Sequence, residues 1–230
     1  HGIRNYTGTI EVNGGNINVV DWCDGIWTSS TGDIKVTGGT ITAGTNGVVT
    51  TGTGKITITG GVITGYKGYA VAELGPETSI ITIGNNEDTD IANKTSPVLI
   101  GSIIGVKSSE STFNFYDGII KAPEGKTISG SVINTPTGYR IINGTETIDG
   151  VEYETAYLDD TYHVTFNENY ENSTTTTKDV KYNTAIGELP TVSREQYIFD
   201  GWYTAEVDGE KITPQPRVKK GPDTGEAIVR

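Results

Sequence analysis

The sequence predicts an all-β chain whose first part is a right-handed parallel β-helix. A short phrase, in which a strand is followed by Gly-Gly and a second strand, occurs three times, at 9–19, 33–44 and 53–65. Glycine is abundant, with 31 residues, while hydrophobic residues make up only 34% of the chain. This composition is typical of repetitive β architectures, which have many corners and a thin core.

The repeat has a period near 22 residues. Ile10, Ile34 and Ile56 are 24 and 22 positions apart, and the Gly-Gly corners keep the same spacing. A period in this range indicates a solenoid in which each rung stacks on the next. We therefore expect ladders of inward-facing side chains. They are Ile10/Ile34/Ile56/Ile81, Val12/Val36/Ile58/Ile83, Ile17/Ile41/Ile63, and a third-strand ladder of Ile26, Val48 and either Ala70 or Val71.

The rhythm loosens in the middle of the chain. Phe113 lies 32 residues after Ile81, about ten more than one period, and we expect the surplus to form an outward loop at 85–95. Asp88 and Asp90 in this loop carry the oxygen ligands that calcium prefers, but the segment lacks the spacing of a defined calcium loop. A solvated acidic loop and a calcium site both stay open, and no metal site is predicted. Phe113 repeats the motif with a larger side chain, as a terminal rung would.

A hairpin is expected at 139–158, where Asn143-Gly144 and Asp149-Gly150 stand between β-rich runs. These two dipeptides are strong hairpin-turn signals. The terminal rung of a solenoid must be covered, because an open sheet edge pairs with other chains. We therefore expect this hairpin to close the end of the coil.

The composition shifts after the hairpin, and the C-terminal part resembles a known family. VTFNEN begins at Val164 and is followed by TTKDVKYNTAIGELPTVSREQYIFDGWYT, which ends at Thr204. This stretch resembles the Listeria–Bacteroides repeat, also known as the internalin B-repeat, in which an opening VTF strand pairs with a later F-x-GW-Y strand. One departure is that Asn167-Glu-Asn-Tyr170 replaces the Asn-Gly-Gly that usually follows the first strand.

The resemblance implies a small β-grasp-like module of the kind found on secreted and cell-surface bacterial proteins. We expect two domains, 1–158 and 159–230, and a core of Phe166, Phe199 and Trp202 in the second. Residues 1–158, especially FNFYDGIIK at 113–121, also resemble β-helical regions of Gram-positive surface proteins.

The composition argues against several function classes. The net charge of −12 disfavours nucleic acid and anionic membranes as partners, and no apolar run approaches the roughly 18 residues of a membrane span. Cys23 is the only cysteine, so no internal disulfide can form. His1 and His163 are the only histidines, and neither accompanies a nucleophile motif. No catalytic residue and no cofactor is therefore predicted.

Four aromatic residues are the candidate ligand-binding residues. Trp22, Trp27, Tyr66 and Tyr69 fall in corresponding parts of successive rungs. Aromatic rings on a rigid face stack on the apolar faces of sugars. The alternative is that these rings close the flank of the coil or pack on the neighbouring rung.

The sequence thus predicts a non-catalytic adhesin, stalk or display segment of a bacterial cell-surface or secreted protein. The main alternative is a carbohydrate-binding β-helix. A polysaccharide lyase or glycoside hydrolase is disfavoured, because the coil has no basic cluster and carboxylate pairs such as Asp21 and Asp24 are explained as solvated corners. We expect an extracellular location, a glycan or a host or cell-wall surface as partner, and a monomeric fragment of a longer chain.

Overall fold

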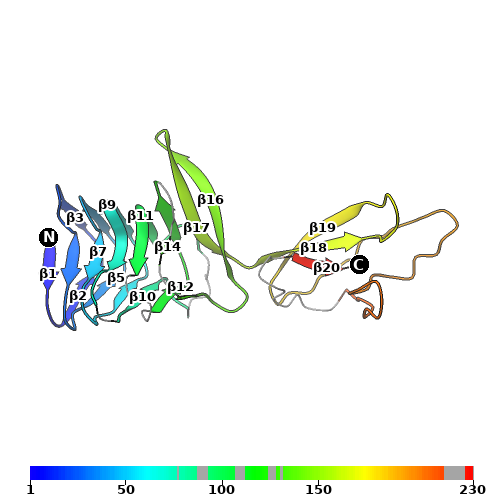
Figure 1. Cartoon of the computed structure of the whole chain (residues 1–230), viewed down its shortest axis with the longest axis horizontal. Coiled ribbons are helices and arrows are strands. Elements are labelled where there is room, and N and C mark those ends of the chain that lie inside the picture. The colour runs from blue at the N-terminus through cyan, green and yellow to red at the C-terminus, as the bar shows by residue number, and fades with distance from the viewer. Residues whose placement is uncertain are drawn as a thin grey trace. The chain divides into compact units, whose positions relative to one another are not determined.

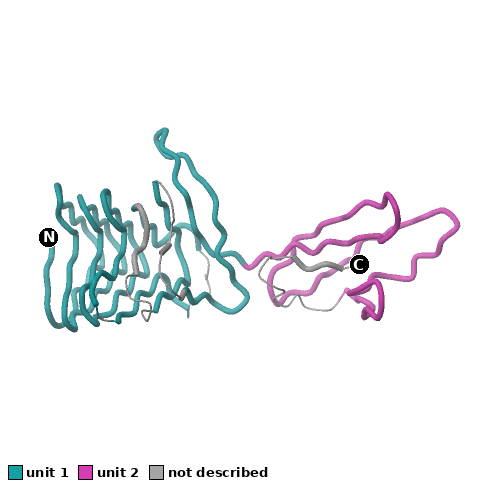
Figure 2. Tube along the Cα trace, in the orientation of Figure 1, with its two compact units in different colours: residues 1–159 teal, residues 160–230 magenta. Residues whose placement is uncertain are grey.

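The computed structural model describes residues 1–76, 78–86, 93–106, 112–123, 128–129, 132–214 and 226–229. The regular secondary structure of these residues consists of β-strands without a helix, which confirms the all-β prediction. The chain divides into two compact units, residues 1–159 and 160–230 (Figure 2). Among the described residues, no helix has the length and apolar character needed to span a membrane.

The first unit is a parallel β-solenoid, as predicted (Figure 1). One of its sheets contains one strand from each successive rung. In spatial order these strands are β2 (Thr9–Val12), β5 (Asp33–Val36), β8 (Ile56–Ile58), β10 (Ile80–Ile83), β12 (Thr112–Phe115) and β15 (Val132–Asn134). Their register aligns Ile10, Ile34, Ile56, Ile81 and Phe113, and also Val12, Val36, Ile58 and Ile83. The first two predicted ladders are therefore confirmed.

The other sheet begins as two columns of strands that later merge. One column is β3 (Asn16–Val19) and β6 (Thr40–Ala43); the other is β1 (Ile3–Asn5), β4 (Ile26–Thr28) and β7 (Val48–Thr50). The long strand β9 (Val62–Glu73) pairs with both β6 and β7 on one side and with β11 (Val98–Val106) on the other. Strand β11 in turn pairs with β13 (Ile119–Ala122) and β14 (Ile128–Ser129). The predicted ladder of Ile17, Ile41 and Ile63 is confirmed. The partner of Val48 is Val71, which decides between the two residues that the sequence left open.

The core lies between these sheets and depends on the contact between rungs. Ile34, Ile56 and Ile81 are at most 1% exposed, whereas Ile10 in the first rung is only partly buried. Burial of one such side chain contributes roughly 1.5–3 kcal/mol. Ile10 has a stacking neighbour on one side only, so it receives less of this stabilisation than the isoleucines in the middle of the ladder.

Glycine is required where the corners of successive rungs touch. Gly39 has a φ of 89°, which side-chain-bearing residues rarely adopt, and a Cβ there would lie 2.7 Å from the carbonyl oxygen of Gly15. At Gly44 a Cβ would lie 1.6 Å from the carbonyl oxygen of Asp21, which is closer than atoms can approach. The rungs can therefore stack at these corners only because no side chain separates the two backbones.

A hairpin closes the end of the second sheet, as predicted. It consists of β16 (Arg140–Ile148) and β17 (Val151–Asp159), and β17 pairs antiparallel with β13. The turn is Asp149-Gly150, whose φ values of 49° and 80° fit a two-residue hairpin turn. Asn143-Gly144, the other turn signal in this stretch, does not form the turn and lies inside β16 opposite β17. A turn signal of this kind acts only where the backbone takes positive φ, and the register of β16 keeps these two residues extended.

Two expectations about the middle of the chain have different outcomes. Ile81 pairs with Phe113, which confirms that the ten surplus residues lie between them. Phe113 does not end the stack, because β12 is followed by a further partner, β15. Asp88 and Asp90 lie outside the described residues, so the structure has no bearing on calcium there.

The second unit contains a three-stranded sheet in the order β19 (Thr175–Lys181), β18 (Thr161–Asn167) and β20 (Glu226–Val229). Phe166 and Trp202 are buried in its core, as expected. The side chains buried with them are Tyr162, Val164, Val180 and Ile186.

The predicted role of Phe199 in this core is wrong, because the side chain is 45% exposed and meets the Trp202 ring edge-on from outside, with 5.4 Å between centroids. The Trp202 indole N–H donates to the carbonyl of Pro190 over 2.8 Å, so this ring is the one that is anchored inside. The expected F-x-GW-Y strand does not form at 199–203. In this segment Tyr203 alone pairs, in an isolated antiparallel bridge with Lys211.

Candidate functional site

Two of the four predicted aromatic residues lie open to solvent near one corner of the coil. Trp22 follows β3 and is 76% exposed, and Tyr66 in β9 is 68% exposed. The Lys67 ammonium lies 3.7 Å from the centroid of the Trp22 ring. Because Lys67 directly follows Tyr66, it links the two rings to the same part of the surface. Most of the ring surface at this corner therefore remains accessible.

Trp27 has a different environment. It lies in β4 between Arg4 and Val49 of the neighbouring rungs, and it is partly buried. The Arg4 guanidinium lies 4.6 Å from the Trp27 ring centroid, the His1 ring stacks at 5.4 Å and the Tyr6 ring meets it edge-on at 5.7 Å. These contacts correspond to the packing alternative, in which the ring closes the flank of the coil.

Tyr69 is partly buried and belongs to a polar ladder. Its backbone N–H donates to Asn46 Oδ1 over 2.8 Å, and the Asn46 side-chain amide donates to Asp24 Oδ1 over 2.8 Å. The Asp24 carboxylate also lies 3.2 Å from His1 Nδ1. Asp24 therefore orders the corner instead of standing in solvent, which corrects the interpretation of this residue as a solvated acid. In the described part of the chain, no ring contact joins any two of Trp22, Trp27, Tyr66 and Tyr69.

Among the described residues, no group of three or more His, Cys, Asp or Glu side chains is placed to hold a metal ion. His163 has a cross-strand partner, since its Nδ1 lies 2.5 Å from Asp179 Oδ1 where β18 pairs with β19. Cys23 is a free, partly buried thiol.

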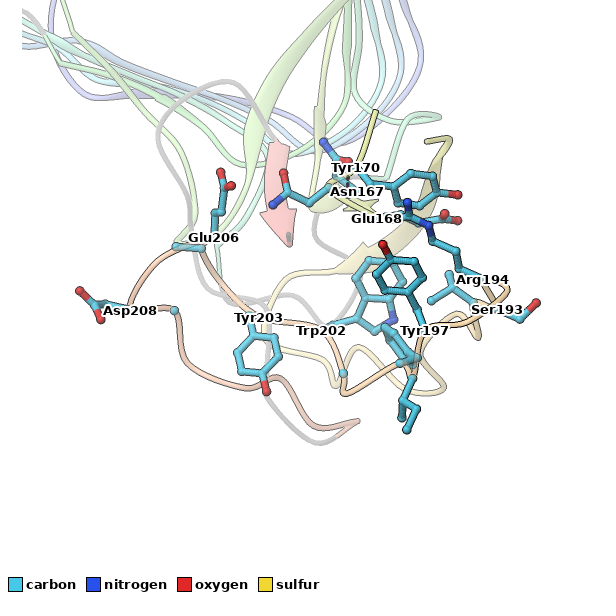
Figure 3. A pocket seen from close by; sticks show the side chains of 17 residues that line it. Asn167, Glu168, Tyr170, Ser193, Arg194, Tyr197, Trp202, Tyr203, Glu206 and Asp208 are labelled. Atoms are coloured by element: carbon cyan, nitrogen blue, oxygen red, sulfur yellow. Dashed lines mark hydrogen bonds between the residues drawn. The ribbon is translucent and has the colours of Figure 1, made fainter. Parts of the chain in front are cut away.

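The second unit contains a groove that the sequence did not predict, with a volume of about 480 Å³ (Figure 3). Trp202, which is 3% exposed, lines it from the core. Large apolar side chains that are exposed to solvent also line it. They are Tyr170, Tyr197, Ile198 and Phe199.

Arg194 lies between two of these rings. The carbon at the centre of its guanidinium is 4.3 Å from the Tyr170 centroid and 4.0 Å from the Tyr197 centroid. A hydrogen bond with the Glu168 carboxylate raises the pKa of Tyr170, because it disfavours ionisation of the phenol, while the charge of Arg194 acts in the opposite direction. Figure 3 shows these residues on one side of the groove, with Glu206 and Asp208 on the other. The groove thus has a cation, Arg194, with the Glu168 carboxylate near it on one side, and two further carboxylates on the other.

An exposed polar cluster adjoins the groove. The Tyr203 hydroxyl donates to Asp200, and the Lys211 ammonium lies 3.2 Å from Asp200 Oδ1. These hydrogen bonds, first that of Tyr203 and then that of Lys211, lower the pKa of Asp200. The same interactions raise the pKa values of Tyr203 and Lys211.

The groove was not predicted, because the sequence analysis placed Phe199 in the core of the second unit. The available signal was the concentration of aromatic residues around Arg194, with Tyr170 upstream and Tyr197 downstream. Their convergence depends on the path of the chain between β18 and Trp202, which no local pattern specifies.

Comparison with known proteins identifies part of the second unit. Residues 162–223 match the family model of the Listeria-Bacteroides repeat domain. This match confirms the resemblance based on the VTF and F-x-GW-Y motifs, and the domain is typical of surface or secreted proteins. The comparisons gave no match to this chain among curated proteins or among solved structures.

Proposed function

We propose that this chain is a non-catalytic display or adhesion segment of a bacterial cell-surface or secreted protein. The observation that carries this proposal is the stack of paired strands from β2 to β15, where Ile34, Ile56 and Ile81 are aligned and almost completely buried. The Listeria-Bacteroides repeat match at 162–223 supports a location at the cell surface or in the secreted fraction.

The physical basis of the display role is stiffness. Adjacent strands of a sheet lie about 4.8 Å apart and are joined by backbone hydrogen bonds, so outward side chains are held at fixed positions. The corner at Gly44 adds direct backbone packing between rungs. A coil built in this way presents groups on its surface without a rearrangement of its core.

A carbohydrate ligand is a second candidate, favoured by the exposure of Trp22 and Tyr66 at one corner. The Tyr66 ring, and the part of the Trp22 ring that the Lys67 ammonium leaves uncovered, can stack on the apolar face of a sugar, and Lys67 supplies a hydrogen-bond donor. Stacking of this kind gives binding without bond cleavage, so this candidate is compatible with the display role.

The first experiment tests the absence of catalysis. The intact chain is incubated with pectin, cellulose, chitin and host glycans, with and without calcium, and reducing ends and unsaturated products are measured. We expect no product. Product that disappears in Asp24→Asn, while the circular dichroism spectrum is unchanged, would overturn the proposal.

The second experiment is a glycan array screened with the intact chain and its variants. If a glycan binds, Trp22→Ala and Tyr66→Ala are each expected to weaken binding about two- to tenfold, because one stacking ring contributes about 0.5–1.5 kcal/mol. Val20→Ala is the control, because Val20 is a non-aromatic side chain that is 69% exposed close to Trp22. Trp27→Ala is expected to lower the melting temperature without changing glycan affinity. Equal affinity in all four variants would exclude this corner as the glycan site.

A further inference from the structure

We propose that the groove of the second unit binds a peptide segment of a partner protein, in which a carboxylate side chain stands next to an apolar one. This inference concerns a different part of the chain from the display role and does not depend on it. The carboxylate would pair with Arg194, and the apolar side chain would enter the groove over Trp202.

The first observation is the state of the Arg194 guanidinium. In the part of the chain that the structure describes, its contacts are the rings of Tyr170 and Tyr197, and it has neither an ion pair nor a hydrogen-bond acceptor. A guanidinium that is covered on its faces keeps its N–H donors at its edges, where they can bind a carboxylate with two parallel hydrogen bonds. The nearby Glu168 does not fill this role, since in the described residues its carboxylate forms no ion pair with the Arg194 guanidinium.

The second observation is the apolar lining beside this cation. Ile198 is 97% exposed and Phe199 is 45% exposed, and both line the groove above the buried Trp202. Isolated exposed apolar residues need no explanation, but a set that converges on one concave site is typical of an interaction surface. The volume of about 480 Å³ accommodates one large side chain together with the adjoining backbone.

The lining favours a peptide over a sugar. A sugar ring needs an open aromatic face, and the guanidinium of Arg194 lies over both Tyr170 and Tyr197. Ile198 offers an aliphatic surface, which matches an apolar side chain. Glu206 and Asp208 on the opposite side complement a basic group, so the charges of the groove also select the direction in which the peptide lies (Figure 3).

The test is an NMR titration of the intact ¹⁵N-labelled chain with blocked tripeptides. The main probe is glutamate–leucine–lysine, and its two controls are glutamine–leucine–lysine and glutamate–serine–lysine. We expect the main probe to shift the Trp202 indole and Gly201 amide signals in a saturable way. Each control probe should bind about tenfold more weakly, because one loses the charge-assisted hydrogen bonds and the other loses the apolar contact.

Two variants assign the carboxylate contact. Arg194→Gln should bind the glutamate and glutamine probes equally weakly, and its unchanged spectrum outside the groove would show that it is folded, as expected for an exposed side chain. Lys178→Gln is the matched control, because it removes a cation of the same unit that is partly buried, donates to the Glu188 carbonyl and does not line the groove, and it should keep the preference for glutamate.

Three results would overturn the proposal. One is the absence of saturable shifts at millimolar peptide. Another is a preference for glutamate that persists in Arg194→Gln. The third is a shift of the same signals by oligogalacturonate when none of the peptides has an effect, which would assign the groove to an acidic glycan.

Discussion

Ile56→Ala is the sharpest test of the stacked core. Ile56 is 0% exposed and is aligned with Ile34 on one side and Ile81 on the other. Its truncation removes buried methyl and methylene groups and leaves a cavity that two rungs must share. Ile→Ala substitutions in cores cost about 2–5 kcal/mol, and we expect about 3–5 kcal/mol here because the rigid ladder cannot collapse into the space.

The matched control is Ile10→Ala, the same substitution in the same ladder. Ile10 is partly exposed and is aligned with Ile34 on one side only. We expect its cost to be about half, because about half of the stacking contact is present.

The assay is urea denaturation followed by far-ultraviolet circular dichroism. With a slope of about 2 kcal/mol per molar urea, the loss at Ile56 would lower the midpoint by about 1.5–2.5 M, and the loss at Ile10 would lower it by about half as much. Equal shifts in the two variants would refute the reasoning that stability comes from contact between rungs. A smaller slope in Ile56→Ala would show that the coil unfolds in parts.

Three further predictions follow from features of the two units. Gly44→Ala should cost about 1–3 kcal/mol or more, because its Cβ collides with a neighbouring backbone, whereas Gly14→Ala, where nothing lies within 4 Å, should leave the melting temperature nearly unchanged. Tyr203→Phe should raise the pKa of Asp200 toward its ordinary value of about 3.9 in an NMR titration, because the strongest hydrogen bond to the carboxylate is lost. Since that pKa is lowered in the folded chain, the stability it contributes is present above the ordinary value and disappears as the pH falls through the lowered one; a variant with an unchanged pKa would contradict this. Residues 160–230 expressed alone should give a well-dispersed NMR spectrum, and collapsed peaks would mean that this unit depends on the first.

The solenoid and the register of its strands could be predicted because β-branched residues recur at the same position of each repeat. Ile34 and Ile56 recur at the period of one rung, and a shift by one residue would turn every such side chain to the opposite face. The choice between Ala70 and Val71 could not be made, since both are apolar and adjacent. Asn143-Gly144 was a misleading turn signal. Its preference for a turn is a local property, whereas the pairing of β16 with β17 fixes its extended conformation.

The groove was beyond the reach of the sequence because it is a tertiary feature. The F-x-GW motif identifies two aromatic residues but does not say which of them faces inward. That choice depends on the bond from the Trp202 indole to Pro190, twelve residues away. The contact of Arg194 with Tyr170 depends likewise on a fold that brings residues 24 positions apart together.

The antiparallel pairing of β17 with β13 makes the two ends of the coil unequal. In the sheet that contains β13, the antiparallel strand β17 covers the edge of β13. At the other end of the coil, β1 and β2 each have one strand neighbour in their sheets. Local opening should therefore start at the first rung and advance inward. Amide hydrogens of Ile3 and Ile10 should exchange with solvent fastest, those of Ile56 slowest, and those of Ile120 beneath the hairpin at rates closer to the middle than to the open end.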